Sequence, residues 1–300
     1  MESALPGNYQ TVKPYLFAVA YRMTGSAADA EDLVQDAWLR FLDAGAPAVD
    51  SLRAYLTTIV SRLALDHLKS ARVQREQYVG EWLPEPVLTS ELMLGPAESA
   101  EQREEVSIAF LTLLERLTPE QRVVYVLREG FGYSHDEIAA TIGKSAAASR
   151  QIFHRAQDRI DKGGPHQPAT IAEHQQVLDQ FAQAFSSGNA ELIAQLLSDD
   201  TVWMGDGGGK RLSTMRPIVG ADRVYRGLAG ALPIWIEQMR HPLTIANING
   251  TPALLMWNDE GIETVLAITV RNGKVWRLQA LRNPDKLRHL EESLARATAV

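Results

Sequence analysis

The sequence predicts a multidomain protein in which two all-α helical domains precede one α+β domain. Up to about residue 162 apolar residues recur with the period of a helix, whereas beyond about residue 200 short apolar stretches alternate with turn pairs. A proline-containing acidic stretch interrupts the helical part, and Lys162-Gly163-Gly164-Pro165 ends it. The predicted boundaries are a first helical domain at 1–79, a linker at 80–104, a second helical domain at 105–164 and an α+β domain at 170–300.

The bulk composition excludes several classes of protein. Hydrophobic residues make up 45% of the 300 residues, yet no apolar run approaches the ~20 residues that span a membrane. The polar N-terminus does not resemble an export signal, so a cytoplasmic location is expected. The absence of cysteine excludes disulfides, thiol nucleophiles and cysteine-ligated zinc. A net charge of −7 means that any nucleic-acid binding must come from local basic patches, aided by a partner.

The segment 29–42, DAEDLVQDAWLRFL, predicts a helix that Ser26 or Asp29 caps. Leu33, Trp38, Phe41 and Leu42 are expected to pack inward, which leaves a dense acidic and polar surface. Such a surface fits either a solvated helix face or a site for a basic protein partner. The candidate partner-binding residues are Asp29, Glu31, Asp32, Gln35 and Asp36.

The segment 51–76 predicts a second, longer helix. Leu56, Ile59, Val60 and Leu63 fall within one arc and are expected to enter the core. The opposite side carries cations near an aromatic residue, a combination that can hold phosphate and a stacked base. A solvated face would show the same pattern. The candidate nucleic-acid contacts are Tyr55, Arg62, Asp66, Lys69 and Arg72.

Residues 133–160 predict a helix, a glycine turn and a second helix. Gly143 suits the left-handed turn, and Ser145 can cap the following helix. A stripe that includes Ser149 and Phe153 is expected to face the core, and the opposite side has the geometry to read base edges in a major groove. A helical hairpin with a solvated face is the alternative. The candidate DNA contacts are Lys144, Ser145, Arg150, Gln151, His154 and Arg155.

The last block combines helices with strands. Two amphipathic helices at 171–197 and one at 221–232 accompany five strand-like stretches, with hairpin pairs at Asn249-Gly250 and Asn272-Gly273. This pattern predicts an antiparallel meander that curves around helices and encloses a cavity. No spacing marks a catalytic dyad or a metal site, so no catalytic residue, metal or cofactor is expected. The polar candidates considered for chemistry are Asp206, Trp203, His174, His241 and Glu237.

The two helical blocks resemble a bacterial sigma factor of the extracytoplasmic function (ECF) type. DAEDLVQDAWLRF is similar to the helix of region 2 that binds core RNA polymerase, and AYLTTIVSRLALDHLKSAR to the segment that recognises and melts the −10 element. Residues 117–159 are similar to the region 4 helix-turn-helix that reads the −35 element. The resemblance implies core RNA polymerase and promoter DNA as partners. This chain has Arg62 where many members have asparagine, Tyr55 where many have tryptophan, and Ser149 where valine is common.

The rest of the chain resembles the SigJ-like subgroup, which carries a SnoaL-like C-terminal domain with the NTF2-like cone fold. Three motifs carry this resemblance: WLPEP at 82–86, DGGGK at 206–210 and NPDKL at 283–287. It implies regulation in cis by the cone and the linker, without a dedicated anti-sigma protein. Asp285 is expected to cap a closing helix. The candidate regulatory residues are Trp82, Pro84, Pro86, Asp206, Gly207, Gly208, Gly209, Lys210, Asn283, Pro284, Asp285 and Lys286.

Two other functions remain open at this stage. One is a ligand-responsive helix-turn-helix transcription factor that binds DNA without polymerase and holds a small molecule in its cone. The other is a SnoaL-like isomerase or hydratase fused to a DNA-binding unit. Neither accounts as simply for the order of the three N-terminal segments, so a sigma factor is the favoured prediction.

Overall fold

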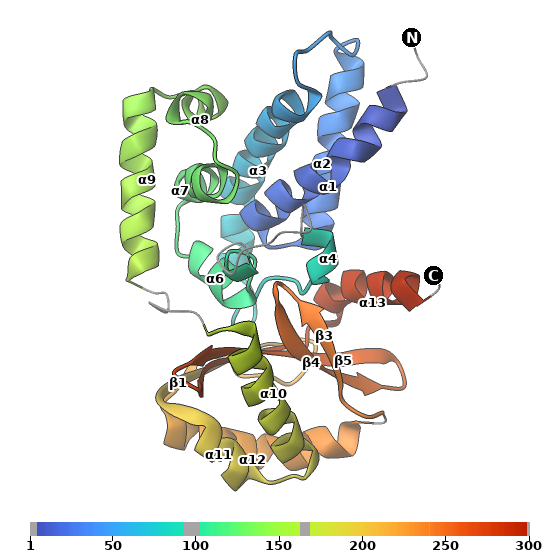
Figure 1. Ribbon diagram of the computed structural model, residues 1–300, viewed down its shortest axis with the longest axis vertical. Coiled ribbons are helices and arrows are strands. Elements are labelled where there is room, and N and C mark those ends of the chain that lie inside the picture. Colours follow the sequence, from blue (N-terminus) through green and yellow to red (C-terminus); the bar gives the residue numbers. More distant parts are fainter. Residues whose placement is uncertain (1–4, 93–102, 163–168, 240, 299–300) are drawn as a thin grey trace. The chain divides into compact units, whose positions relative to one another are not determined.

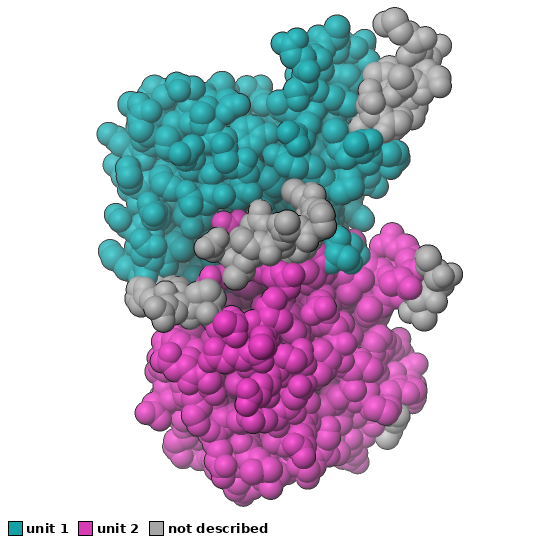
Figure 2. All heavy atoms as spheres, in the orientation of Figure 1, with its two compact units in different colours: residues 1–77, 90–98, 110–164 teal, residues 78–89, 99–109, 165–300 magenta. Residues whose placement is uncertain are grey.

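A computed structural model describes residues 5–92, 103–162, 169–239 and 241–298. The chain divides into two compact units, which are coloured separately in Figure 2. The first unit comprises residues 1–77, 90–98 and 110–164, and the second comprises 78–89, 99–109 and 165–300. The segment between the two helical blocks therefore contributes residues to both units.

The first unit begins with a three-helix bundle made by α1 (Leu5–Thr24), α2 (Ala27–Asp43) and α3 (Leu52–Glu76) (Figure 1). The Ser26 hydroxyl caps α2 by accepting a hydrogen bond from the Asp29 amide, so the first of the two predicted caps is used. Leu33 and Phe41 are buried as predicted, and so are Leu56 and Val60. Leu42 was predicted to point inward, but its side chain is 42% exposed.

The second helical part of this unit contains the predicted helix-turn-helix. Gly143 has a φ of 67° at the end of α8, where a residue with a Cβ would be strained, and the Ser145 hydroxyl caps α9. Ser149 is fully buried and its hydroxyl lies 3.0 Å from Nδ1 of His135, which satisfies a polar group at a packing position. The elements are α4 (Thr89–Leu92), α6 (Ile108–Leu114), α7 (Pro119–Tyr125), η1 (Val126–Gly130), α8 (His135–Ile142) and α9 (Ala146–Asp161).

The second unit contains a six-stranded sheet with the order β2-β1-β6-β5-β4-β3. The predicted antiparallel meander is confirmed for β3 to β6, but β1 pairs with β6 in parallel, which the sequence pattern did not indicate. Both predicted hairpin pairs have positive φ at each residue, as a type I′ turn requires. The strands are β1 (Leu197–Asp206), β2 (Ile218–Val219), β3 (Thr244–Ile248), β4 (Thr251–Asn258), β5 (Gly261–Arg271) and β6 (Lys274–Leu281).

Each face of this sheet has its own apolar core. The sheet curves around α10 (Ile171–Ser186), α11 (Ala190–Leu196) and α12 (Ala221–Gln238), as Figure 1 shows. Phe181, Trp203 and Trp235 belong to the core on this concave side. On the other face, Leu83 of the linker and Leu287 of α13 (Pro284–Thr298) pack against the strands. The predicted fold class, two helical domains followed by an α+β cone, is confirmed. A search of the described helices finds none that is long and apolar enough to cross a membrane.

Candidate polymerase, promoter and linker-binding sites

Helix α9 presents the predicted −35 residues on one side. Arg150, Gln151, His154 and Arg155 are exposed, whereas Phe153 of the opposite side is buried. Lys144 and Ser145 are exposed at the start of the helix. Nζ of Lys144 lies 3.4 Å from a carboxylate oxygen of Glu120, and partly exposed pairs of this kind contribute little to stability.

Cations lie close to the His135 ring, near the start of α9. The pKa of His135 lies below its ordinary value, first because burial disfavours the charged ring. The positive charges of Arg128 and Arg150 and the nearby His154 lower it further. The exposed cations of this helix lie where the sequence predicts a local basic patch.

Helix α2 exposes most of the predicted polymerase-binding residues. Glu31, Asp32, Gln35 and Asp36 are exposed. Asp29 is different, because its carboxylate lies 3.2 Å from Nε2 of His67 on α3 and so faces the bundle.

Sequence reasoning missed two apolar residues on the exposed face of α2. Leu39 is 47% exposed and Leu42 is 42% exposed. They follow Asp32, Gln35 and Asp36 at helical spacings of three and four residues, so acidic and apolar side chains share one face. The same spacing was visible in the sequence and could have identified them.

The predicted −10 residues of α3 have mixed environments. Tyr55 is half-buried and its ring meets the Phe41 ring edge-on at 5.8 Å. Lys69 pairs with Asp66 on the exposed surface at 3.1 Å. Nε and one terminal nitrogen of Arg62 donate hydrogen bonds to the main-chain oxygens of Thr141 and Ala140, each at 3.0 Å. The side chain of Arg72 lies outside the described residues.

In the second unit, the three predicted motifs meet at one buried carboxylate, that of Asp206. One of its oxygens accepts hydrogen bonds from the Tyr78 hydroxyl at 2.5 Å and from the Gly208 amide at 3.1 Å. The other accepts from the Leu83 amide at 2.9 Å and from Nζ of Lys286 at 2.7 Å. Leu83 belongs to the predicted linker, and Tyr78 follows the end of α3 at Glu76, so from here on the linker is taken to begin at residue 78. We call these residues, together with Trp82 and Asn283, the linker clamp.

Lys286 is the cation of the linker clamp and is buried. Besides Asp206, its ammonium donates to the main-chain oxygen of Leu83 at 2.6 Å. The nitrogen also lies 3.9 Å from the centroid of the Trp82 ring and 4.9 Å from that of the Tyr78 ring, which is cation–π geometry. One α13 side chain thus contacts three linker residues.

The Tyr78 hydroxyl completes the clamp as a donor and an acceptor. It donates to Asp206 and accepts a hydrogen bond from Nδ2 of Asn283 at 2.8 Å. Burial raises the pKa of Tyr78 well above its ordinary value, and the hydrogen bond to the Asp206 carboxylate raises it further. Tyr78 therefore stays protonated and keeps its hydrogen bond to Asp206.

The glycines of the DGGGK motif permit close packing at the clamp. A Cβ on Gly208 would lie 2.3 Å from Nδ2 of Asn283, and one on Gly207 would lie 2.1 Å from the main-chain oxygen of Arg211. A Cβ on Gly209 would meet Val79 of the linker at 3.3 Å. The glycines therefore let the backbone approach Asn283 and Val79 closely.

The remaining regulatory candidates surround the clamp. Pro84 and Pro86 are buried with the linker, whereas Lys210 and Asp285 form an exposed pair at 2.6 Å. Pro284 is exposed at the first position of α13. The prediction that Asp285 caps α13 is wrong: Oδ1 of Asn283 accepts the hydrogen bond from the Asp285 amide, because Asn283 directly precedes the first helical residue.

A second contact holds the linker at the β3–β4 turn. Oδ1 of Asn249 accepts from the Val87 amide at 3.0 Å, and its Nδ2 donates to the Val106 oxygen at 2.9 Å. The Gly250 amide donates to the Thr89 hydroxyl at 2.9 Å. Asn249 was predicted only as a turn residue, because partners more than 140 positions away leave no local pattern in the sequence.

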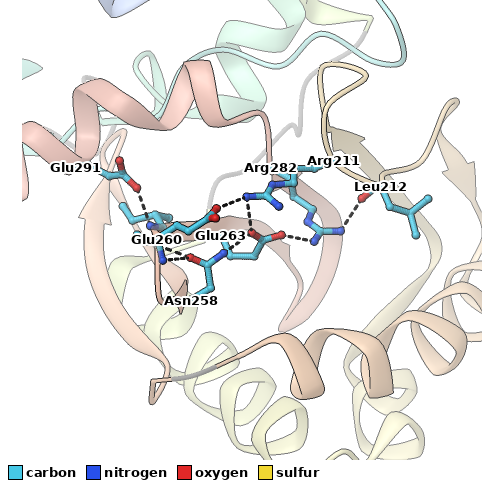
Figure 3. Close-up of polar contacts among 9 residues, drawn as sticks. Arg211, Leu212, Asn258, Glu260, Glu263, Arg282 and Glu291 are labelled. Atoms are coloured by element: carbon cyan, nitrogen blue, oxygen red, sulfur yellow. Dashed lines mark hydrogen bonds and ion pairs between the residues drawn. The ribbon is translucent and has the colours of Figure 1, made fainter.

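A further polar cluster ties the loop after the DGGGK motif to β5 (Figure 3). The buried Arg282 guanidinium donates to the Leu212 oxygen and to Glu263, both at 2.5 Å. Arg211 lies 3.1 Å from Glu260 and 3.6 Å from Glu263. Sequence reasoning missed this cluster, which positions the loop and leaves the Glu263 carboxylate bound by cations.

The polar candidates considered for chemistry do not form a catalytic arrangement. The Asp206 carboxylate is occupied by the linker clamp, and the His174 ring nitrogen Nε2 lies 3.0 Å from the Ile268 oxygen. Trp203 packs in the concave core, whereas Glu237 and His241 are exposed. Asp206, His174 and Trp203 are therefore buried, whereas Glu237 and His241 lie on the surface.

Comparison with known proteins agrees with this geometry. Residues 9–73 match the model of sigma-70 region 2, and residues 107–159 match that of sigma-70 region 4. The chain is 37% identical over 290 residues to the ECF RNA polymerase sigma factor SigJ of Mycobacterium tuberculosis. The aligned residues cover 93% of this chain and 91% of that protein. It is 34% identical over 287 residues to a protein of the same organism named "Probable ECF RNA polymerase sigma factor SigI", with 94% of each chain covered.

A solved structure extends the similarity to three dimensions. The crystal structure of Mycobacterium tuberculosis SigJ superposes with a TM-score of 0.75 and 33% sequence identity. The superposition covers 94% of this chain and 98% of that one, so it includes the cone as well as the two helical regions. The chain therefore belongs to the ECF family of RNA polymerase sigma factors.

Proposed function

We propose that this chain binds core RNA polymerase and directs it to promoters, with the linker and cone modulating that activity in cis. In this proposal the exposed face of α2 binds polymerase, α3 contacts the −10 element and α9 reads the −35 element. The observation that carries it is the pair of matched regions, in order, with an exposed cationic helix in region 4. Run-off transcription with purified core polymerase tests it: RNA should start at a defined site only when the chain is present.

Two separate DNA-contacting regions suit an acidic protein that binds DNA weakly by itself. A good bidentate base contact contributes about 1–3 kcal/mol of discrimination, so one helix reads too few bases to select a promoter alone. When polymerase holds both readers, the second contact becomes intramolecular and the overall affinity rises. Tight, sequence-specific binding by the purified chain without polymerase would favour a ligand-responsive transcription factor instead.

The role of α9 is tested by Arg150→Ala. The variant should lower run-off transcription from a cognate promoter about tenfold and relax the preference at one −35 position, because one base contact is lost. Its binding to core polymerase should not change. Arg226→Ala is the matched control, since Arg226 is an exposed helical arginine in the second unit that pairs with Asp222. Equal promoter activity of the Arg150 variant and the wild type would refute the assignment.

The linker clamp supports the regulatory part of the proposal. Residues of three separate motifs meet there: Lys286 makes a buried, charge-assisted hydrogen bond to Asp206 and lies over the Trp82 ring. Asn283 donates to the Tyr78 hydroxyl, which in turn donates to Asp206. Both partners of the ion pair are buried, and a buried ion pair is seldom the most stabilising way to fill a core. Its presence is better explained by a specific docked position for the linker.

A further inference from the structure

Region 2 packs against region 4 within the first unit, and two arginine contacts take part. In one, Arg62 of α3 donates two hydrogen bonds to the carbonyls of Ala140 and Thr141. These carbonyls lie in the last turn of α8, where main-chain oxygens lack helical partners and carry a partial negative charge. The planar guanidinium of arginine matches two neighbouring acceptors in a way that a lysine ammonium does not.

The other contact joins α1 to the chain that precedes α8. The buried Arg22 donates to the Gly130 oxygen at 3.2 Å, and its guanidinium carbon lies 4.8 Å from the centroid of the Phe131 ring. The Tyr15 ring meets the Phe131 ring edge-on at 5.2 Å, and its hydroxyl lies 3.5 Å from that of Tyr133. Two arginines of region 2 are therefore bound by region 4.

In this arrangement the distance between regions 2 and 4 is too short for both to contact their promoter elements at once. Arg62 contacts α8, which packs on α9, and a helix is about 10–12 Å wide, so Arg62 lies within about 25 Å of the reading face of α9. Elements centred near −10 and −35 are about 25 base pairs apart, or about 85 Å at 3.4 Å per base pair. Regions 2 and 4 must separate before both can contact one promoter.

We propose that Arg62 is an intramolecular latch that holds region 2 on region 4 in the free chain. On promoter binding its guanidinium exchanges the α8 carbonyls for DNA. Arg62 is exposed, so the exchange does not require a buried charge to cross the core. A phosphate carries a full negative charge and competes well with carbonyl dipoles for the guanidinium. The exchange rests on the proposed function, in which Arg62 faces the −10 element.

Distance measurements on the full-length chain test the latch without polymerase. The protein has no cysteine, so Ala48→Cys and Gln157→Cys place one dye on an exposed position of each region. In single-molecule energy transfer, the labelled chain with Arg62 intact should show mainly the short distance between the two dyes. Arg62→Ala should raise the ratio of long to short distances about tenfold, because two charge-assisted hydrogen bonds are lost. Lys69→Ala is the control: it removes an exposed cation of α3 that pairs with Asp66, and should leave the ratio unchanged.

A second variant distinguishes the loss of the contact between regions 2 and 4 from the loss of DNA contact by Arg62. Phe131→Ala removes the ring that Arg22 and Tyr15 contact, keeps Arg62, and should also shift the population toward long distances. Arg62→Lys keeps the positive charge but not the planar guanidinium that binds two acceptors, so it should give an intermediate ratio of long to short distances. An unchanged distance distribution in Arg62→Ala and Phe131→Ala, with melting temperatures like that of the wild type, would overturn the latch. Failure of run-off transcription with the distance shifts intact would instead contradict the proposed function.

Discussion

At the scale of single residues, we expect linker docking to depend on Lys286. It neutralises the buried Asp206 and contacts Tyr78, Trp82 and Leu83 of the linker. Lys286→Met leaves the Asp206 carboxylate buried without a cation, which typically costs about 3–5 kcal/mol. We expect the melting transition of the second unit to fall by roughly 6–20 °C, since each kcal/mol shifts Tm by about 2–4 °C in domains of this size. Calorimetry and proteolysis of the linker measure the effect.

The control for this change lies in the neighbouring motif. Lys210 also pairs with an aspartate, Asp285, but both side chains are 53% exposed. Exposed pairs contribute about 0–1 kcal/mol, so Lys210→Met should leave the transition and the rate of linker cleavage nearly unchanged. Similar effects of the two lysine variants would show that the buried pair does not hold the linker.

His174 gives the second unit a pH dependence whose sign follows from burial. Burial lowers the pKa of His174 below its ordinary value of 6.5. As the pH falls below about 6.5, the unfolded chain binds a proton there that the folded chain resists, so the free energy of unfolding decreases. His174→Gln removes this proton and can keep the hydrogen bond to the Ile268 oxygen. The loss of Tm between pH 7.5 and pH 5.5 should therefore be smaller in the variant than in the wild type.

An exposed histidine provides the comparison for that measurement. His241 lies on the surface, so His241→Gln should retain the pH response of the wild type. If the two glutamine variants lose Tm equally between the two pH values, His174 does not carry the proposed proton linkage.

Residues whose roles depend on local sequence were predictable, and those whose partners are distant were not. Gly143 and Ser145 were predicted because a turn and a helix cap involve neighbours within four positions. Tyr78 was missed, because its partners Asp206 and Asn283 lie 128 and 205 positions away. The WLPEP, DGGGK and NPDKL motifs were found through family resemblance, but only the fold brings them to one carboxylate.

At the scale of elements, the exposed face of α2 combines acidic residues with Leu39 and Leu42. A protein partner that buries Leu39 removes apolar surface from water, and truncating such a contact typically costs about 1–1.5 kcal/mol. Leu39→Ala should therefore weaken binding to core polymerase about tenfold in a pull-down or titration. The fold should be unaffected, because the side chain is 47% exposed.

Leu192 of α11 is the matched control, since it is 43% exposed on a helix of the second unit. Leu192→Ala should leave the affinity for polymerase unchanged. Wild-type affinity of the Leu39 variant would assign polymerase binding on α2 to its acidic residues alone.

The helices and the hairpin-linked strands were predicted more fully than the sheet order. A helix shows its own period, and the pair β5–β6 shows its turn in the sequence at Asn272-Gly273. The parallel pairing of β1 with β6 joins strands some 70 residues apart and leaves no local trace. The two-residue strand β2 is too short to show any alternation.

At the scale of the whole molecule, residues 78–89 and 99–109 between the helical blocks belong to the second unit, and this affects how regulation can be tested. Leu83 and Val87 are fully buried there, and Ile108 belongs to the same core as Leu83. Cutting the chain after Gly164 would expose these apolar residues. A change in transcription by such a fragment would therefore combine the loss of regulation with the loss of a folded partner for the linker. A point change that releases the linker is the cleaner experiment.

Asn249→Gly should release the second linker contact while keeping the hairpin. Asn249 has a φ of 49°, a conformation that glycine adopts readily, but glycine lacks the side chain that binds Val87 and Val106. Asn272→Gly changes the equivalent position of the other hairpin, where φ is 52°, and serves as the control. Proteolysis within residues 78–109 should accelerate in the Asn249 variant alone.

The same variant should raise promoter output if the docked linker restrains the sigma regions. The segment 78–109 has about 32 residues, which can span about 100 Å when extended, more than the roughly 85 Å between the promoter elements. Docking at Leu83, Val87 and Val106 holds parts of this length on the second unit, so release lets regions 2 and 4 separate farther. In run-off transcription we expect at least about threefold more RNA from Asn249→Gly than from Asn272→Gly or the wild type. Faster linker cleavage without any gain in RNA would mean that docking stabilises the cone and does not restrain transcription.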